Sequence, residues 1–129
     1  MVIDTSALLS ILFEEDDSVE LADRISEAAS RRISAVNFVE AGVVADSNPN
    51  KLKGRMFDQV VLLLGIAIEP TTAEEAYLAR EAYRRYGKGR HGARLNLGDC
   101  FAYALSKATG EPLLYKGEDF AQTDIEPAR

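Results

Sequence analysis

The opening stretch V-I-D-T-S-A, residues 2–7, decides the fold class of this chain. A short apolar run starting at Met1 ends directly in the acid Asp4, and an amphipathic pattern follows from Thr5 to Phe13. This is the pattern of a short buried strand that passes straight into a helix. Short apolar runs alternate with longer amphipathic ones along the rest of the chain. The sequence therefore predicts an α/β fold with a parallel sheet of four or five strands sandwiched by helices.

The predicted order is β-α-α-β-α-α-β-α-α-β, followed by a turn and a short fifth strand, with right-handed crossovers. Strands are predicted at Met1–Ile3, Arg32–Val36, Ile66–Ile68, Pro112–Tyr115 and, as the fifth, Thr123–Ile125. Helices are predicted at Thr5–Phe13, from the acidic turn at 14–17 to about Ala29, at Asn37–Asp46, at Lys51–Leu64, after the cap residue Thr72 to Tyr86, and from Asn96 to Gly110.

Length and composition indicate one folded domain spanning residues 1–129. The single cysteine, Cys100, has no partner for an intramolecular disulfide, and no Cys/His cluster has the spacing of a zinc site. No apolar run approaches the ~20 residues that span a bilayer, and the first residues do not resemble an export signal. We therefore expect a cytoplasmic protein that does not insert into membranes.

The charges are unevenly distributed along the chain. The net charge is −6, which argues against non-specific binding to a polyanion. A basic stretch nevertheless runs from residue 80 to 94 and is opposed only by Glu81. Its members are Arg80, Arg84, Arg85, Lys88, Arg90, His91 and Arg94. This stretch is either a local anion-binding surface or a solvated helix face that ends in a glycine-spaced loop.

Four acids, Asp4, Glu40, Asp99 and Asp119, each lie at or just after an apolar stretch. In parallel α/β folds the carboxyl ends of the strands share one edge, where ligands bind. Folding would thus gather four carboxylates whose mutual repulsion favours either protonation or a bound cation. All-oxygen ligands suit hard ions, so the expected cofactor is Mg²⁺ or Mn²⁺.

Each acid also has a structural explanation when it is taken alone. Asp4 can cap the helix that follows it. Glu40 lies three residues after Asn37, and Asp99 lies three residues after Asn96, which is the spacing of a capping box. Asp119 fits an ordinary surface turn. The two explanations are compatible, because a helix N-terminus stabilises the ionised carboxylate that a metal needs.

The chain resembles the PIN-domain ribonucleases, specifically the VapC-type toxins of toxin-antitoxin pairs. Four motifs in order carry the resemblance over nearly the whole chain: V-I-D-T-S-A, S-A-V-N-F-V-E-A, L-N-L-G-D-C-F-A-Y-A-L-S and L-L-Y-K-G-E-D-F-A-Q-T-D-I. Carried over by position, it makes Asp4, Glu40, Asp99 and Asp119 the catalytic and metal-binding acids. Supporting polar residues would be Thr5, Ser6 and Asn96. Glu118 and Asp124 flank Asp119, and either could supply or replace that ligand.

The implied activity is Mg²⁺- or Mn²⁺-dependent hydrolysis of RNA phosphodiesters, with Asp4 and Asp99 as the main ligands. The basic stretch would then help to hold RNA, through Arg85, Lys88, Arg90, His91 and Arg94. The resemblance also implies a cognate antitoxin, a homodimer and a possible toxin-antitoxin hetero-oligomer. Two other functions stay open: a non-catalytic PIN-like module that binds RNA or protein, and another Mg²⁺-dependent phosphoryl enzyme in which Lys116 pairs with an aspartyl phosphate.

Overall fold

A four-stranded parallel sheet forms the middle of the computed structural model, which describes residues 1–128. The strands lie in the order β3-β2-β1-β4, so the first strand is central. Val2 in β1 pairs with Arg32 on one side and with Leu113 on the other. The strands are β1 Val2–Ile3, β2 Arg32–Ser34, β3 Ala67–Glu69 and β4 Leu113–Leu114. The predicted fold class is confirmed.

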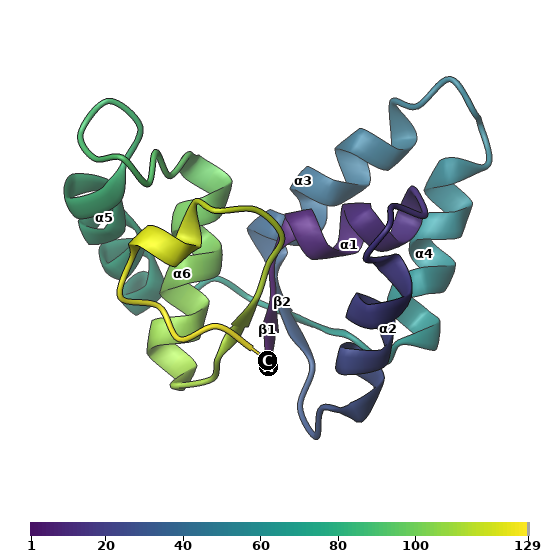
Figure 1. Cartoon of the computed structure of the whole chain (residues 1–129), viewed down its shortest axis with the longest axis horizontal. Coiled ribbons are helices and arrows are strands. Elements are labelled where there is room, and N and C mark those ends of the chain that lie inside the picture. Colours follow the sequence, from purple (N-terminus) through teal and green to yellow (C-terminus); the bar gives the residue numbers. More distant parts are fainter. Residues whose placement is uncertain (129) are drawn as a thin grey trace.

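The helices cover both faces of the sheet. Figure 1 shows α1 to α4 on one side and α5 and α6 together on the other. This follows from the strand order. The connections from β1 to β2 and from β2 to β3 run across the sheet in one direction, and the connection from β3 to β4 runs back in the other. Right-handed crossovers in opposite directions place their helices on opposite faces. The helices are α1 Thr5–Leu12, α2 Ser18–Glu27, α3 Ala35–Asp46, α4 Lys53–Leu63, α5 Ala73–Tyr86 and α6 Leu97–Thr109. Within residues 1–128, none of them combines the length and apolar character needed to cross a membrane.

Successive residues of a strand pack into two separate hydrophobic clusters. Val2 and Leu113 pack into the cluster made largely by α5 and α6, whereas Ile3 and Leu114 pack into the cluster made by α1 to α4. Neighbouring side chains on a strand point to opposite faces, so a strand of two apolar residues serves both layers. Full burial of each such side chain contributes about 1.5–3 kcal/mol.

The predicted fifth strand at Thr123–Ile125 is wrong. A short 3₁₀ helix, η1, occupies Phe120–Gln122, and the chain reaches the sheet only afterwards, through a single parallel bridge between Leu113 and Pro127. The backbone N–H of Leu113 donates to Glu126 at 2.9 Å, and that of Ala128 donates to Leu113 at 2.8 Å. Pro127 has no N–H to continue a ladder, which limits the pairing to one bridge.

The predicted start of the third helix at Asn37 is also wrong. α3 begins at Ala35, and its N-cap is Ser34, whose hydroxyl accepts the N–H of Val36 at 3.2 Å. Glu40 therefore lies in the second turn, and it forms no capping box with Asn37. Serine is a strong N-cap residue, and Asn37 is left with a side chain that is free for contacts inside the protein.

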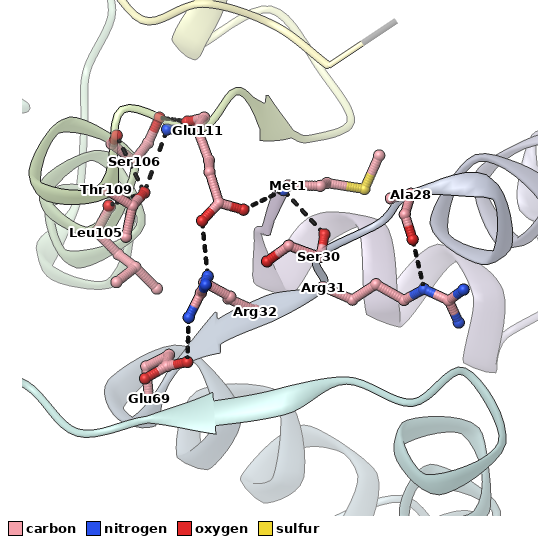
Figure 2. A network of polar contacts seen from close by, with 10 residues as sticks. All are labelled: Met1, Ala28, Ser30, Arg31, Arg32, Glu69, Leu105, Ser106, Thr109 and Glu111. Atoms are coloured by element: carbon pink, nitrogen blue, oxygen red, sulfur yellow. Dashed lines mark hydrogen bonds and ion pairs between the residues drawn. The ribbon is translucent and has the colours of Figure 1, made fainter.

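A polar network joins segments of all four strands (Figure 2). The Glu111 carboxylate, just before β4, accepts from the amino group of Met1 and from Nε of Arg32, the latter at 2.6 Å. Arg32 also donates to Glu69 in β3 at 2.7 Å, and the Met1 amino group donates to the carbonyl of Ser30 at 2.9 Å. Glu111 thus pairs with two partly buried cations at once, the Met1 amino group and Arg32, and shares Arg32 with Glu69.

Replacing Glu111 with glutamine should destabilise the protein by about 2 kcal/mol, because hydrogen bonds to charged groups contribute more than neutral ones. The measurement is urea unfolding, with the midpoint lowered and the slope unchanged. Glu20→Gln is the matched control: its i,i+4 pair with Arg24 involves a glutamate side chain that is 66% exposed, so about 0.5 kcal/mol or less is expected. Equal costs for the two variants would contradict a structural role for Glu111.

Candidate active site

Asp4 is the buried centre of the candidate site. It follows β1 directly and is the N-cap of α1, as predicted, and only 2% of the residue is exposed. Its Oδ2 accepts the backbone N–H of Ser6 at 3.0 Å and the Ser6 hydroxyl at 2.6 Å. Its Oδ1 is buried and has no hydrogen-bond partner among residues 1–128. A buried carboxylate oxygen without a partner is costly, and it is the feature expected of an atom that receives a ligand.

Ser6 connects Asp4 to the segment after β4. Its hydroxyl donates to Asp4 and accepts the backbone N–H of Lys116 at 2.9 Å. The N–H of Asp4 in turn donates to the carbonyl of Leu114 at 2.9 Å. The ends of β1 and β4 are therefore tied together at the point where Asp4 lies. The Ser6 hydroxyl thus both donates and accepts, and it holds one oxygen of Asp4 in place.

Glu40 reaches the same edge from the second turn of α3. Oγ1 of Thr5 donates to its Oε1 at 2.5 Å, and Nδ2 of Asn37 approaches the same oxygen at 3.5 Å. Asn37 is completely buried, and its Nδ2 also donates to the carbonyl of Gly98 at 2.9 Å. Thr5 and Asn37 thus fix the position of Glu40 between α1, α3 and the start of α6.

Gly98 allows α6 to approach this acid. A Cβ added at Gly98 would lie 2.2 Å from Oε2 and 2.5 Å from Oε1 of Glu40. Neither Asn37 nor Gly98 is among the site residues predicted from the sequence. The available signals were an amide within the apolar run 35–39 and a glycine in the first turn of a helix, where its propensity is poor.

Asp99 interacts electrostatically with each of the other three acids. Its predicted capping box with Asn96 is confirmed. The backbone N–H of Asp99 donates to Oδ1 of Asn96 at 2.9 Å, and the backbone N–H of Asn96 donates to Oδ2 of Asp99 at 3.0 Å. Burial raises the pKa of Asp99 to about 6; the Asn96 hydrogen bond opposes this rise, and the charges of Asp119 and Glu40 add to it. Burial also raises the pKa of Asp4 to about 7, against the Ser6 hydrogen bonds and with smaller contributions from Asp99 and Glu40.

The four acids interact, but they do not form a ready-made cage. Within residues 1–128, no group of three or more His, Cys, Asp or Glu side chains is arranged closely enough to hold a metal ion. The donor set nevertheless fits a hard divalent cation, since every predicted ligand is a carboxylate and Asp4 keeps a buried oxygen unpaired. Two carboxyl pKa values raised toward neutrality also mean that a cation would relieve an existing electrostatic cost.

Two residues near the site are engaged elsewhere. Asp124 accepts the Tyr103 hydroxyl at 2.6 Å and pairs with Lys107 at 3.0 Å, so its carboxylate faces α6. Nζ of Lys116 pairs with Glu15 at 2.9 Å and with Asp17 at 3.2 Å. Lys116 therefore points to the acidic turn before α2, which argues against the receiver-like alternative. Of the acids after β4, Asp119 is the one whose charge acts on Asp99.

The predicted RNA-binding residues separate into two sets. Arg85 and Arg90 lie over the rings of Tyr86 and Tyr83, and His91 packs edge-on against Tyr86. In contrast, Lys88 and Arg94 line a cavity of about 280 Å³ together with Asn96 and Asp119. The second set therefore borders the acidic site directly.

The raised carboxyl pKa values predict that the chelator-treated protein loses stability as pH rises. In an unfolded chain both carboxyls have a pKa near 3.9, so the folded protein binds protons more tightly. The resulting stability is present below about pH 4 and is lost as pH rises through about 6 for Asp99 and about 7 for Asp4. The melting temperature should fall between about pH 5 and about pH 8.

Asp4→Asn is the control for this pH dependence. Asparagine caps a helix as well as aspartate does, so the variant should fold, show a flatter pH profile and melt higher than wild type at alkaline pH. A profile as steep as that of wild type would contradict the assignment to Asp4.

The PIN domain family matches residues 1–126. A ribonuclease VapC of Mycolicibacterium smegmatis is 46% identical over 125 residues, covering 97% of both chains. Ribonuclease VapC28 of Mycobacterium tuberculosis is 43% identical over 129 residues, covering 99% of this chain and 97% of the relative.

A solved structure supports the fold independently. The crystal structure of Mycobacterium tuberculosis VapC20, described as a toxin that cleaves the sarcin-ricin loop, superposes with a TM-score of 0.75 over 96% of this chain and 95% of that one. At 16% sequence identity this likeness concerns the fold alone. The match over residues 1–126 and the relatives at 43% and 46% identity show that this chain belongs to the PIN domain family and, within it, to the VapC ribonucleases.

Proposed function

We propose that this chain is a metal-dependent endoribonuclease that acts as the toxin of a toxin-antitoxin pair. The observation that carries the proposal is the buried Asp4 carboxylate, with an oxygen unpaired among residues 1–128, next to the charges of Asp99 and Glu40 at the end of the central strand. The ends of β1 and β4 form the switch point of the strand order β3-β2-β1-β4, which is where parallel α/β folds bind ligands.

VapC ribonucleases with a PIN domain depend on a metal in general, and we propose Mg²⁺ or Mn²⁺ for this chain. Asp4 and Asp99 would be its main ligands, and Glu40 and Asp119 would complete the set directly or through water. When bound, such an ion neutralises charge that develops on the phosphoryl oxygens and lowers the pKa of its water.

The chain's own residues have distinct parts in this hydrolysis. Ser6 holds one oxygen of Asp4 and leaves the other available. Thr5 donates to Oε1 of Glu40, and no hydrogen bond within residues 1–128 engages Oε2, which would accept a proton from the attacking water. That water would form the new P–O bond while the bond to the leaving ribose oxygen breaks, and the leaving oxygen would take a proton from solvent water. Asp119 is exposed and approaches the site from the segment after β4.

The proposed partners follow from family membership. A VapC toxin implies a cognate VapB antitoxin and an RNA substrate. For this chain we further propose a homodimer, a toxin-antitoxin hetero-oligomer and a cytoplasmic location. Cys100 is buried and unpaired, which suits a reducing compartment.

Replacing either Asp4 or Asp99 with asparagine should reduce RNA cleavage at least about 100-fold, because each replacement removes a charged ligand. The measurement is cleavage of total RNA with added Mg²⁺ or Mn²⁺, with the cut ends mapped. Asp23→Asn, on the exposed surface of α2, is the control and should cleave like wild type. Full activity of both site variants, or cleavage that survives a chelator, would refute the mechanism. No cleavage by wild type with either ion would favour a non-catalytic binding module.

Gly98→Ala should lower cleavage about 10-fold or more without unfolding the protein, because the new methyl group displaces the Glu40 carboxylate. Gly54→Ala is a matched control. It is also a helical glycine, and its Cβ would approach Oδ1 of Asp46 at 2.3 Å, but on α4 away from the site. Circular dichroism should show both variants folded, and only the Gly98 variant should lose activity. Wild-type activity in both variants would show that cleavage does not depend on the position of the Glu40 carboxylate.

A further inference from the structure

The loop between α5 and α6 is a closed and internally bonded structure. Gly87 and Leu95 form a parallel bridge, in which Lys88 N–H donates to Leu95 and Leu95 N–H donates to Tyr86, both at 2.9 Å. Ala93 and Leu95 are completely buried and anchor the loop in the core. The loop therefore presents its side chains in set directions.

Most basic side chains around this loop are used within the protein. Arg85 donates to the Tyr86 hydroxyl at 2.9 Å, and Arg90 lies over Tyr83 at 5.4 Å. Nδ1 of His91 accepts the N–H of Ala93 at 2.9 Å, which ties the exposed ring to the loop backbone. These contacts turn the three side chains toward the protein's own aromatic rings and backbone.

Lys88 and Arg94 make none of the contacts that hold Arg85, Arg90 and His91 against Tyr83, Tyr86 and the backbone of Ala93. Neither side chain takes part in an ion pair or a hydrogen bond within residues 1–128. Both are exposed, and they line the cavity of about 280 Å³ whose other walls are Asn96 and Asp119. Two free cations thus border a cavity that opens beside the proposed catalytic acids.

Arg94 also has an unfavourable backbone conformation. Its φ is +58°, in the left-handed region that glycine and asparagine adopt more readily. Gly89 in the same loop has a φ of +86°, which is ordinary for glycine. An arginine in this backbone conformation lowers the free energy of unfolding, and backbone strain of this kind is concentrated at functional sites.

We propose that Lys88 and Arg94 form a phosphate subsite that binds the RNA backbone next to the phosphodiester being cut. This inference rests on the proposed ribonuclease function. The acids repel an incoming phosphate, and a pair of cations beside them provides the attraction that the net charge of −6 does not. The arginine fork can bind phosphate oxygens in pairs, and the lysine acts as a point charge.

The test is steady-state cleavage, over a range of salt concentrations, of a labelled single-stranded RNA oligonucleotide that spans a site mapped with the wild-type protein. Lys88→Gln and Arg94→Asn should each raise KM about 5- to 10-fold and leave kcat within about two-fold, because uniform binding is lost. The salt dependence of KM should weaken by about 0.7 in slope for each lost phosphate contact.

Two internal checks separate this role from a structural one. Arg94→Asn suits the left-handed backbone, so its melting temperature should equal or exceed that of wild type while its KM rises. Arg55→Gln removes one charge from the exposed surface of α4 and should change neither KM nor the salt slope. An Arg94→Asn variant that binds RNA like Arg55→Gln would overturn the proposal.

The remaining outcomes are also decisive. Unchanged RNA cleavage by both variants, together with weaker binding of the cognate antitoxin, would assign the two cations to a protein partner and overturn the subsite. Cleavage by wild type with unaltered KM in both variants would remove the subsite alone. Failure of wild type to cleave RNA with either Mg²⁺ or Mn²⁺ would remove the proposed function itself.

Discussion

The burial of an ionisable carboxylate at the end of the central strand is the constraint on which the rest of this site depends. Asp4 is almost completely buried, and its pKa is raised to about 7 because burial outweighs the stabilising hydrogen bonds from Ser6. Burying a carboxylate is costly unless its oxygens are hydrogen-bonded, and carboxylates with strongly raised pKa values are concentrated at functional sites. Here one oxygen is satisfied by Ser6, and the other has no hydrogen-bond partner in the part of the chain that the structure describes.

The supporting residues come from elements that are distant in the chain. Thr5 and Asn37 bracket Glu40 from α1 and α3, and Asn37 reaches across to the backbone of Gly98 in α6. The lack of a side chain at Gly98 is what lets the Glu40 carboxylate lie there. The acids that cap helices also benefit from the helix dipole, so one arrangement stabilises both the fold and the ionised form of the site.

The charge pattern resolves an apparent conflict between an acidic chain and an anionic substrate. Net charge describes the whole surface, whereas binding depends on the local field near the site. The loop between α5 and α6 uses Arg85, Arg90 and His91 in its own packing and leaves Lys88 and Arg94 beside Asp119. A basic stretch that is uniform in the sequence thus becomes two sets in the structure that differ in the contacts they make.

The sequence by itself determined the alternation of strands and helices, the caps at Asp4 and Asn96, and the four candidate acids, because periodicity and capping act over a few residues. It failed at Asn37 and at the fifth strand, where local patterns allowed more than one outcome. Only the tertiary structure decided the strand order, the approach of Gly98 to Glu40, and the position of Lys88 and Arg94 beside Asp119. The contact between Asn37 and Gly98 joins residues 61 positions apart, and no local preference encodes a contact of that range.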